Sequence, residues 1–112
     1  EEQMDAVTAV SGSGPAYVLY FIEALQQAAS ELGFSAAQAR QLALETFSGA
    51  VKMAAHSGED AATLRARVTS RGGTTERAIA TLEAQAVRQS IAHAVRAAAA
   101  RSRELGDELG GD

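Results

Sequence analysis

The sequence predicts an all-α domain, and three observations support that prediction. Apolar residues recur three and four positions apart over long stretches, which is the spacing of one face of an α-helix. Alternation of apolar and polar residues never persists, and the β-branched residues typical of strands are scattered. Glycine and serine occur where the helical stretches end. We therefore predict a bundle of about five to six helices.

In the N-terminal part, the sequence predicts a helix break followed by a long helix. Residues 4–10 form a short stretch that the segment Ser11-Gly12-Ser13-Gly14-Pro15 interrupts. Pro15 suits the first turn of a helix, where its missing N–H group costs nothing. The apolar face of this helix extends to Leu32, and Gly33 is expected to end it. Its members are Val18, Phe21, Ile22, Leu25, Ala28, Ala29 and Leu32.

Two further helices are predicted in the middle of the chain. Ser35 with Gln38 is typical of a capping box, so a second long helix should begin here and continue to His56-Ser57-Gly58. Asp60 or Glu59 can start a third, shorter helix. The apolar positions of the second helix are Ala39, Leu42, Ala43, Phe47, Ala50, Val51 and Ala54, and those of the third are Leu64 and Val68.

The C-terminal part predicts a helix from Thr74 to about Glu83 and then a last long one. The apolar face of the last helix consists of Val87, Ile91, Val95, Ala98 and Leu105. Its charged residues should lie largely on the solvent side; they are Arg88, Arg96, Arg101, Arg103 and Glu104. The segment Gly110-Gly111-Asp112 is expected to be a frayed tail.

Composition favours a single domain that associates with a second copy. The 112 residues are 46% apolar but only 4% aromatic, so the chain offers little bulky side-chain volume for a core. Alanine dominates the apolar residues, and helices lined with alanine can approach one another closely. We therefore expect burial between interdigitated helices, and a dimer.

Charge and residue content argue against several functions. A net charge of −4 disfavours a nucleic-acid surface, and the absence of cysteine removes disulfides and thiolate chemistry. No apolar run approaches the roughly 20 residues that span a bilayer. The start Glu1-Glu2-Gln3 is unlike a signal peptide, so the sequence predicts a cytoplasmic protein without a membrane segment.

The segment from Val68 to Thr75, Val-Thr-Ser-Arg-Gly-Gly-Thr-Thr, is the most informative feature. Gly72 and Gly73 can adopt backbone angles closed to other residues and let a ligand approach the main chain. Thr74 or Thr75 can cap the following helix, whose first amides and positive dipole end favour a carboxylate or phosphate. The segment predicts a small-anion pocket. The alternative is a plain turn between two helices, capped by a threonine.

Other candidate sites are weaker. His56 and His93 fall on different predicted helices, so we predict no metal site. Ser11 lies among glycines but lacks the preceding strand of a nucleophile elbow. Gly12 and Gly14 match only part of a dinucleotide fingerprint, so the chain is not expected to hold a cofactor by itself.

Four motifs together resemble the C-terminal domain of the pyrroline-5-carboxylate reductase family. They are the segment from Asp5 to Tyr17, which includes Ser11-Gly12-Ser13-Gly14-Pro15, then Gly49-Ala50-Val51-Lys52-Met53, then Val68-Thr69-Ser70 with Gly72-Gly73-Thr74-Thr75, and Arg101-Ser102-Arg103-Glu104-Leu105. Their order and spacing both agree with the family. The resemblance covers nearly the whole chain.

The resemblance implies a role for residues 1–112 as the C-terminal dimerisation and substrate-binding domain of an oxidoreductase. Such enzymes reduce 1-pyrroline-5-carboxylate to L-proline with NADPH or NADH, which an N-terminal Rossmann domain binds. The helical domain dimerises by intertwining its helices, and dimers often form rings. Without the cofactor domain this segment is expected to be inactive, and the choice between NADH and NADPH is made in that other domain.

The resemblance also implies roles for individual residues. Ser70 and the N–H groups around Gly72, Gly73 and Thr74 hold the substrate carboxylate. The Thr75 hydroxyl reaches the ring nitrogen and is the one catalytic group. Ser11 and Gly12 lie near the nicotinamide end of the cofactor. No metal is implied.

Some positions depart from the family pattern. Arg71 stands where proline is usual, so the loop loses a fixed backbone angle and gains a positive charge. Ala61 and Ala66 replace a proline and an acidic residue. Two alternatives therefore stay open: a structural helical dimerisation module, and a paralogous reductase with a different substrate.

Overall fold

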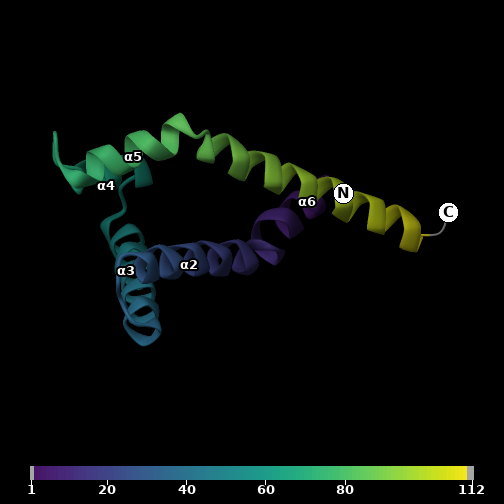
Figure 1. Ribbon diagram of the computed structural model, residues 1–112. Coiled ribbons are helices and arrows are strands. Elements are labelled where there is room, and N and C mark those ends of the chain that lie inside the picture. The colour runs from purple at the N-terminus through teal and green to yellow at the C-terminus, as the bar shows by residue number, and fades with distance from the viewer. Residues whose placement is uncertain (1, 111–112) are drawn as a thin grey trace. The chain divides into compact units, whose positions relative to one another are not determined.

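The computed structural model describes residues 2–110, and every regular element in them is helical. The elements in order are α1 (Glu2–Val7), the π-helical turn η1 (Thr8–Gly12), α2 (Gly14–Glu31), α3 (Ala36–Ser57), α4 (Ala61–Arg67), α5 (Thr74–Ala84) and α6 (Val87–Gly110) (Figure 1). The all-α prediction is confirmed. Within the described residues no helix combines the length and apolar character needed to cross a membrane.

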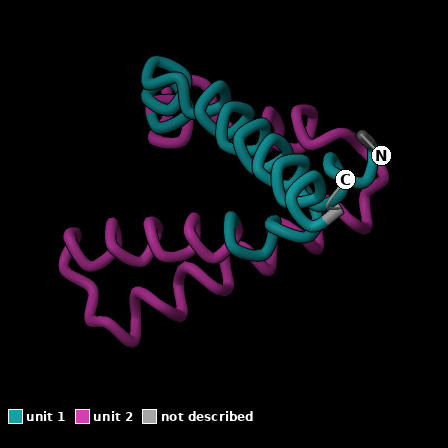
Figure 2. Tube along the Cα trace, turned by 90° about the vertical axis from the view of Figure 1, so that its right-hand side faces the viewer, with its two compact units in different colours: residues 1–17, 78–112 teal, residues 18–77 magenta. Residues whose placement is uncertain are grey.

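The chain divides into two units, shown in different colours in Figure 2. One unit consists of residues 1–17 and 78–112, and the other of residues 18–77. The loop between α4 and α5 lies in the second unit, whereas η1 lies in the first. Each unit is described by itself below.

Local signals in residues 18–77 set the helix ends, as the sequence predicted. The capping box is formed: Gln38 N donates to Ser35 Oγ at 3.2 Å, and Ser35 N donates to Gln38 Oε1 at 3.0 Å. Gly58 follows α3 with a φ of +74°, a left-handed angle that favours glycine. The predicted limits of α3 are therefore confirmed.

Burial in this unit depends on small side chains. Ala39 and Ala43 of α3 are each 1% exposed, and Leu64 of α4 is 8% exposed. A hollow of about 240 Å³ between α2 and α3 remains open. Its lining is Leu25, Ala28, Ala29, Leu32, Phe34, Leu42, Ala43 and Thr46. The unit thus leaves much of its apolar surface in contact with solvent.

In the other unit, α1 and η1 pack against α6. Ala9 of η1 is fully buried, and Ser102 Oγ of α6 donates to Asp5 Oδ1 of α1 at 2.8 Å. These two residues are 97 positions apart in the sequence. A long-range contact therefore holds the N-terminal helix of the chain.

The predicted break at residues 11–15 is wrong in extent. The backbone stays helical through Gly12, and only Ser13 separates η1 from α2. Ser13 N donates to Thr8 O at 2.8 Å, the five-residue spacing of a π-turn. The Tyr17 hydroxyl donates to Ala9 O at 2.6 Å. These two bonds satisfy carbonyl groups that a loop would have left to water.

The turn between α5 and α6 lies where the sequence placed it. Ala86 adopts a φ of +57°, and Arg88 Nη2 donates to Glu83 Oε1 at 2.8 Å. The hydrogen bond to Glu83, together with its charge, raises the pKa of Arg88 above its ordinary value. Since arginine is protonated at any physiological pH, the raised pKa does not change the charge of Arg88.

The last helix is longer than predicted. Gly110 belongs to α6 and is no frayed tail, while Gly111 and Asp112 lie outside the described residues. Arg101 Nη1 contacts Glu104 Oε1 at 3.0 Å and Glu108 Oε2 at 3.5 Å. The pair of Arg101 with Glu104, three residues apart, adds about 0.2–0.5 kcal/mol, which helps the helix to continue past Leu105.

Candidate functional site

The candidate loop begins at a well-anchored helix end. Leu64 is the buried residue of α4. At the end of the helix, Val68 N donates to Leu64 O at 3.3 Å, and Thr69 N donates to Ala66 O at 3.2 Å. Thr69 Oγ1 donates to Arg65 O at 2.6 Å. The Thr69 hydroxyl is therefore used to close α4, and the first side chain that can face a ligand is that of Ser70.

Gly72 has a backbone reason to be glycine, and Gly73 closes the turn against Ser70. Gly72 has a φ of +72°, where an L side chain is strained. Gly73 N donates to Ser70 O at 3.1 Å, and a Cβ on Gly73 would lie 3.4 Å from both Ser70 Cβ and Ser70 O. The loop is thus a tight turn in which Ser70 and Gly73 touch.

The predicted cap is wrong, because neither threonine caps α5. The helix begins at Thr74, and Arg77 N donates to Gly73 O at 3.3 Å. The tight turn onto Ser70 places the Gly73 carbonyl where it accepts the first bond of the helix. Thr74 and Thr75 therefore lie inside the first turn, exposed, and their N–H groups have no acceptor within the helix.

Glu76, in the first turn of α5, contacts the loop and is a residue that the sequence analysis missed. Gly72 N donates to Glu76 Oε1 at 2.5 Å, so a carboxylate of this chain already binds a loop amide. An acidic residue in the first turn of a helix is favourable because it lies near the positive end of the helix dipole. The spacing of four residues between Gly72 and Glu76 was the signal in the sequence that could have indicated this contact.

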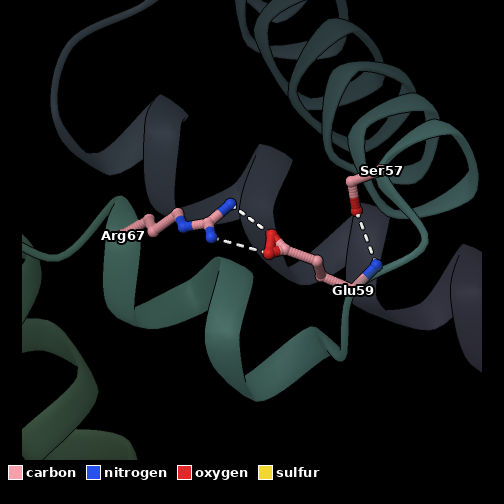
Figure 3. Close-up of polar contacts among 3 residues, drawn as sticks. All are labelled: Ser57, Glu59 and Arg67. Carbon is pink, nitrogen blue, oxygen red and sulfur yellow. Dashed lines mark hydrogen bonds and ion pairs between the residues drawn. The ribbon is translucent and has the colours of Figure 1, made fainter.

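A polar brace joins the end of α4 to the end of α3, and Figure 3 shows its three side chains. Glu59 N donates to Ser57 Oγ at 3.1 Å, and Arg67 Nη2 donates to Glu59 Oε2 at 2.6 Å. A second nitrogen of Arg67 pairs with the other oxygen of Glu59, which makes the contact bidentate. The brace fixes the last residue of α4, directly before the loop.

Two of the predicted site residues belong to the other unit of the chain. Ser11 and Gly12 are exposed residues of η1, in the unit of residues 1–17 and 78–112. The other predicted residues, Ser70 and Gly72 to Thr75, lie in one continuous segment that consists of the α4–α5 loop and the start of α5, within residues 18–77. The side chain of Arg71 in that loop is exposed.

The metal-ligating side chains do not gather. His56 lies in the last turn of α3 and His93 lies in α6, and both are exposed. Over residues 2–110 no group of three or more His, Cys, Asp or Glu residues could hold a metal ion. The loop is the remaining candidate for chemistry.

The fold and the loop define a class: a helical association domain that presents helix N-terminal amides at a glycine turn. Its exposed apolar residues include Val18, Leu19, Tyr20, Phe21 and Leu25 of α2, and Leu32 directly after it. The family model described as pyrroline-5-carboxylate reductase dimerisation matches residues 1–105. The chain belongs to this family.

Curated relatives agree with the family. The chain is 47% identical over 110 residues to the pyrroline-5-carboxylate reductase of Pseudomonas aeruginosa, covering 98% of this chain and 40% of the relative. It is 40% identical over 111 residues to pyrroline-5-carboxylate reductase 2 of Bacillus subtilis, covering 99% of this chain and 40% of the relative. The chain thus spans about 40% of the length of these relatives.

Solved structures are similar as well. A Plasmodium falciparum pyrroline carboxylate reductase with NADP bound matches with a TM-score of 0.91 and 37% identity, covering 95% of this chain and 40% of that one. A pyrroline-5-carboxylate reductase from Coxiella burnetii matches with a TM-score of 0.90 and 44% identity, covering 94% and 39%.

Proposed function

We propose that this chain is the dimerisation and substrate-binding domain of an enzyme that reduces 1-pyrroline-5-carboxylate to L-proline. The observation that carries the proposal is the Ser70–Thr75 loop at the start of α5. Its Gly72 amide already holds a carboxylate, that of Glu76, at 2.5 Å. The N–H groups of Thr74 and Thr75 lie beside it without intrahelical acceptors. This arrangement suits a small substrate that carries a carboxylate.

The loop would hold the substrate so that its imine carbon faces a hydride donor. Backbone N–H groups of Gly72, Gly73 and Thr74, with the Ser70 hydroxyl, are assigned to the carboxylate. The Thr75 hydroxyl is assigned to the ring nitrogen, which ends the reaction as the amine of proline. Holding a reactant in this way removes much of the entropic cost of reaction. Gly73 N must leave Ser70 O to take part, because the two are bonded at 3.1 Å.

The hydride would come from NADPH or NADH, which supplies the redox chemistry when bound. This chain offers no complete dinucleotide motif. Its own contribution would be limited to the nicotinamide end, where we assign the exposed Ser11 hydroxyl and the Gly12 backbone of η1. A separate cofactor domain is therefore part of the proposal.

The proposed partner is a second copy of the chain. Leu32 is 82% exposed, Leu19 is 63% exposed and Val51 is 62% exposed, all on the long helices α2 and α3 or directly after them. Exposed apolar surface on this scale marks an association site. An intertwined homodimer would cover it, and dimers could assemble further into a ring.

The structural dimerisation module is the second candidate. Its support is Arg71, which replaces the usual proline and is exposed beside two glycines. A loop with more backbone freedom pays more entropy on binding a ligand. A paralogous reductase acting on another substrate is the third candidate. Activity on pyrroline-5-carboxylate separates the first candidate from the other two.

The test is an assay of pyrroline-5-carboxylate reduction with the full-length protein that carries these residues. Thr75→Ala should lower kcat/KM by about 10²-fold or more, the usual range for losing a group that acts on the reacting atoms. Thr75→Ser keeps the hydroxyl and should retain most activity. The free energy of unfolding of both variants should lie within about 0.5 kcal/mol of that of the parent, because the substituted side chain is exposed. Equal losses of stability and activity in Thr75→Ala would contradict the role of the hydroxyl.

A further inference from the structure

Glu76 occupies a position that the proposed substrate needs. Its Oε1 accepts from Gly72 N at 2.5 Å, and the same amide is assigned to the substrate carboxylate. The amide of Gly73 is also taken, by Ser70 O at 3.1 Å. The third assigned amide is that of Thr74. It lies at the start of α5 and has no acceptor within the helix.

Two carboxylates cannot share the Gly72 amide. An amide N–H group has one hydrogen to donate, and carboxylates held within a few ångströms repel one another. A substrate carboxylate must therefore displace Glu76 or bind without Gly72. The side chain of Glu76 is exposed on the first turn of α5, so it can swing into solvent without disturbing a core.

We propose that Glu76 acts as a built-in competitor: its carboxylate holds the Gly72 amide in the free enzyme and is displaced when the substrate carboxylate binds. This inference rests on the proposed function, because it uses the same loop. It makes Glu76 a positioning residue that sets affinity for the carboxylate. It does not touch the reacting atoms.

The contact also has a use in the free enzyme. Gly72 sits at a φ of +72°, and Arg71 before it lacks the fixed angle that proline would supply. The Glu76 side chain ties this turn to the first turn of α5 and keeps its amide aimed at a carboxylate. The loop is thus held in a receptive geometry, while substrate affinity is reduced by the competition.

Two substitutions separate competition from simple support of the loop. Glu76→Gln keeps an acceptor oxygen for Gly72 N but removes the charge, whereas Glu76→Ala removes both. If Glu76 competes, Glu76→Gln should lower KM for pyrroline-5-carboxylate, by about three- to tenfold for an exposed charged hydrogen bond, and leave kcat within about twofold. Glu76→Ala should also lower KM but by less, because it loses the tie that orders the turn. If Glu76 only supports the loop, Glu76→Ala should raise KM and Glu76→Gln should leave it unchanged.

A substrate without a carboxylate provides the decisive readout. With 1-pyrroline, the same ring lacking the carboxylate, neither variant should change kcat/KM by more than about twofold, because the competition is only with a carboxylate. Glu31→Gln is the matched control, since Glu31 is an exposed acid at the end of α2, away from the loop sequence. It should leave KM for both substrates unchanged.

The outcomes distinguish this inference from the function on which it rests. A full-length protein that does not reduce pyrroline-5-carboxylate overturns both. An active protein in which Glu76→Gln and Glu76→Ala leave KM unchanged, or raise it, overturns the competitor role alone. A fall in KM for pyrroline-5-carboxylate that is matched by an equal change for 1-pyrroline also overturns it, because a general change in the loop would affect both substrates.

Discussion

The α4–α5 loop and the η1 segment are held by different kinds of contact. In the loop, Gly73 N reaches Ser70 O and Gly72 N reaches Glu76 Oε1, so every partner lies within four residues. The N-terminal segment depends on Tyr17 and on a bond between Asp5 and Ser102, which are 97 residues apart. The first geometry is encoded locally, and the second exists only when distant helices pack together. Substitutions should therefore act differently in the two regions.

The largest effect is expected for Gly72→Ala in the loop. An alanine at a φ of +72° costs about 1–2 kcal/mol in the folded state, and a loop that relieves this strain no longer aims its amide at a carboxylate. We expect KM for pyrroline-5-carboxylate to rise strongly and the midpoint of urea unfolding to fall, measured by steady-state kinetics and circular dichroism.

Gly106→Ala is the matched control for this substitution. Gly106 lies inside α6, and a Cβ there meets nothing within 4 Å. Alanine in a helix interior is favoured over glycine by roughly 0.5–1 kcal/mol, so stability should rise or stay constant. Similar losses in both variants would show that the left-handed angle of Gly72 is not what matters.

A smaller effect is expected for Tyr17→Phe in the other region. The substitution leaves Ala9 O of the π-turn without its hydroxyl donor at 2.6 Å, and a lost hydrogen bond of this kind costs about 0.5–1.5 kcal/mol. We expect faster amide hydrogen exchange across residues 8–13, with no change in residues 68–77. Tyr20→Phe is the control, because Tyr20 is 69% exposed. Faster exchange in the α4–α5 loop would break the distinction between the two regions.

The smallest effect is expected for Arg67→Gln. Its partly exposed ion pair with Glu59 is worth at most about 1 kcal/mol, so stability should fall only slightly and less at high salt. Because the brace fixes the residue before the loop, KM should rise modestly, by about two- to threefold. Arg65→Gln, on the same helix, should have less effect on KM. The measurement is kinetics at low and high ionic strength; an effect independent of salt would contradict an ionic brace.

The errors of the sequence analysis fall in both regions. Periodicity and caps placed α2 to α6 close to their observed limits, because each signal acts over three or four residues. Thr74 or Thr75 was expected to cap α5. The turn between Ser70 and Gly73 instead puts Gly73 at the N-cap position. Glu76 was missed because an acid in a first helical turn is common and does not by itself indicate a partner.

The sequence by itself determined the helical class, the order of the helices, the glycine loop and the family, because these depend on short-range periodicity, backbone preference and motif spacing. Only the tertiary structure decided that η1 continues as a π-turn and that Asp5 meets Ser102. The reason is physical: contacts between distant residues depend on which helix faces pack together. Their entropic cost is recovered only by burial such as that of Ala9, which no local pattern records.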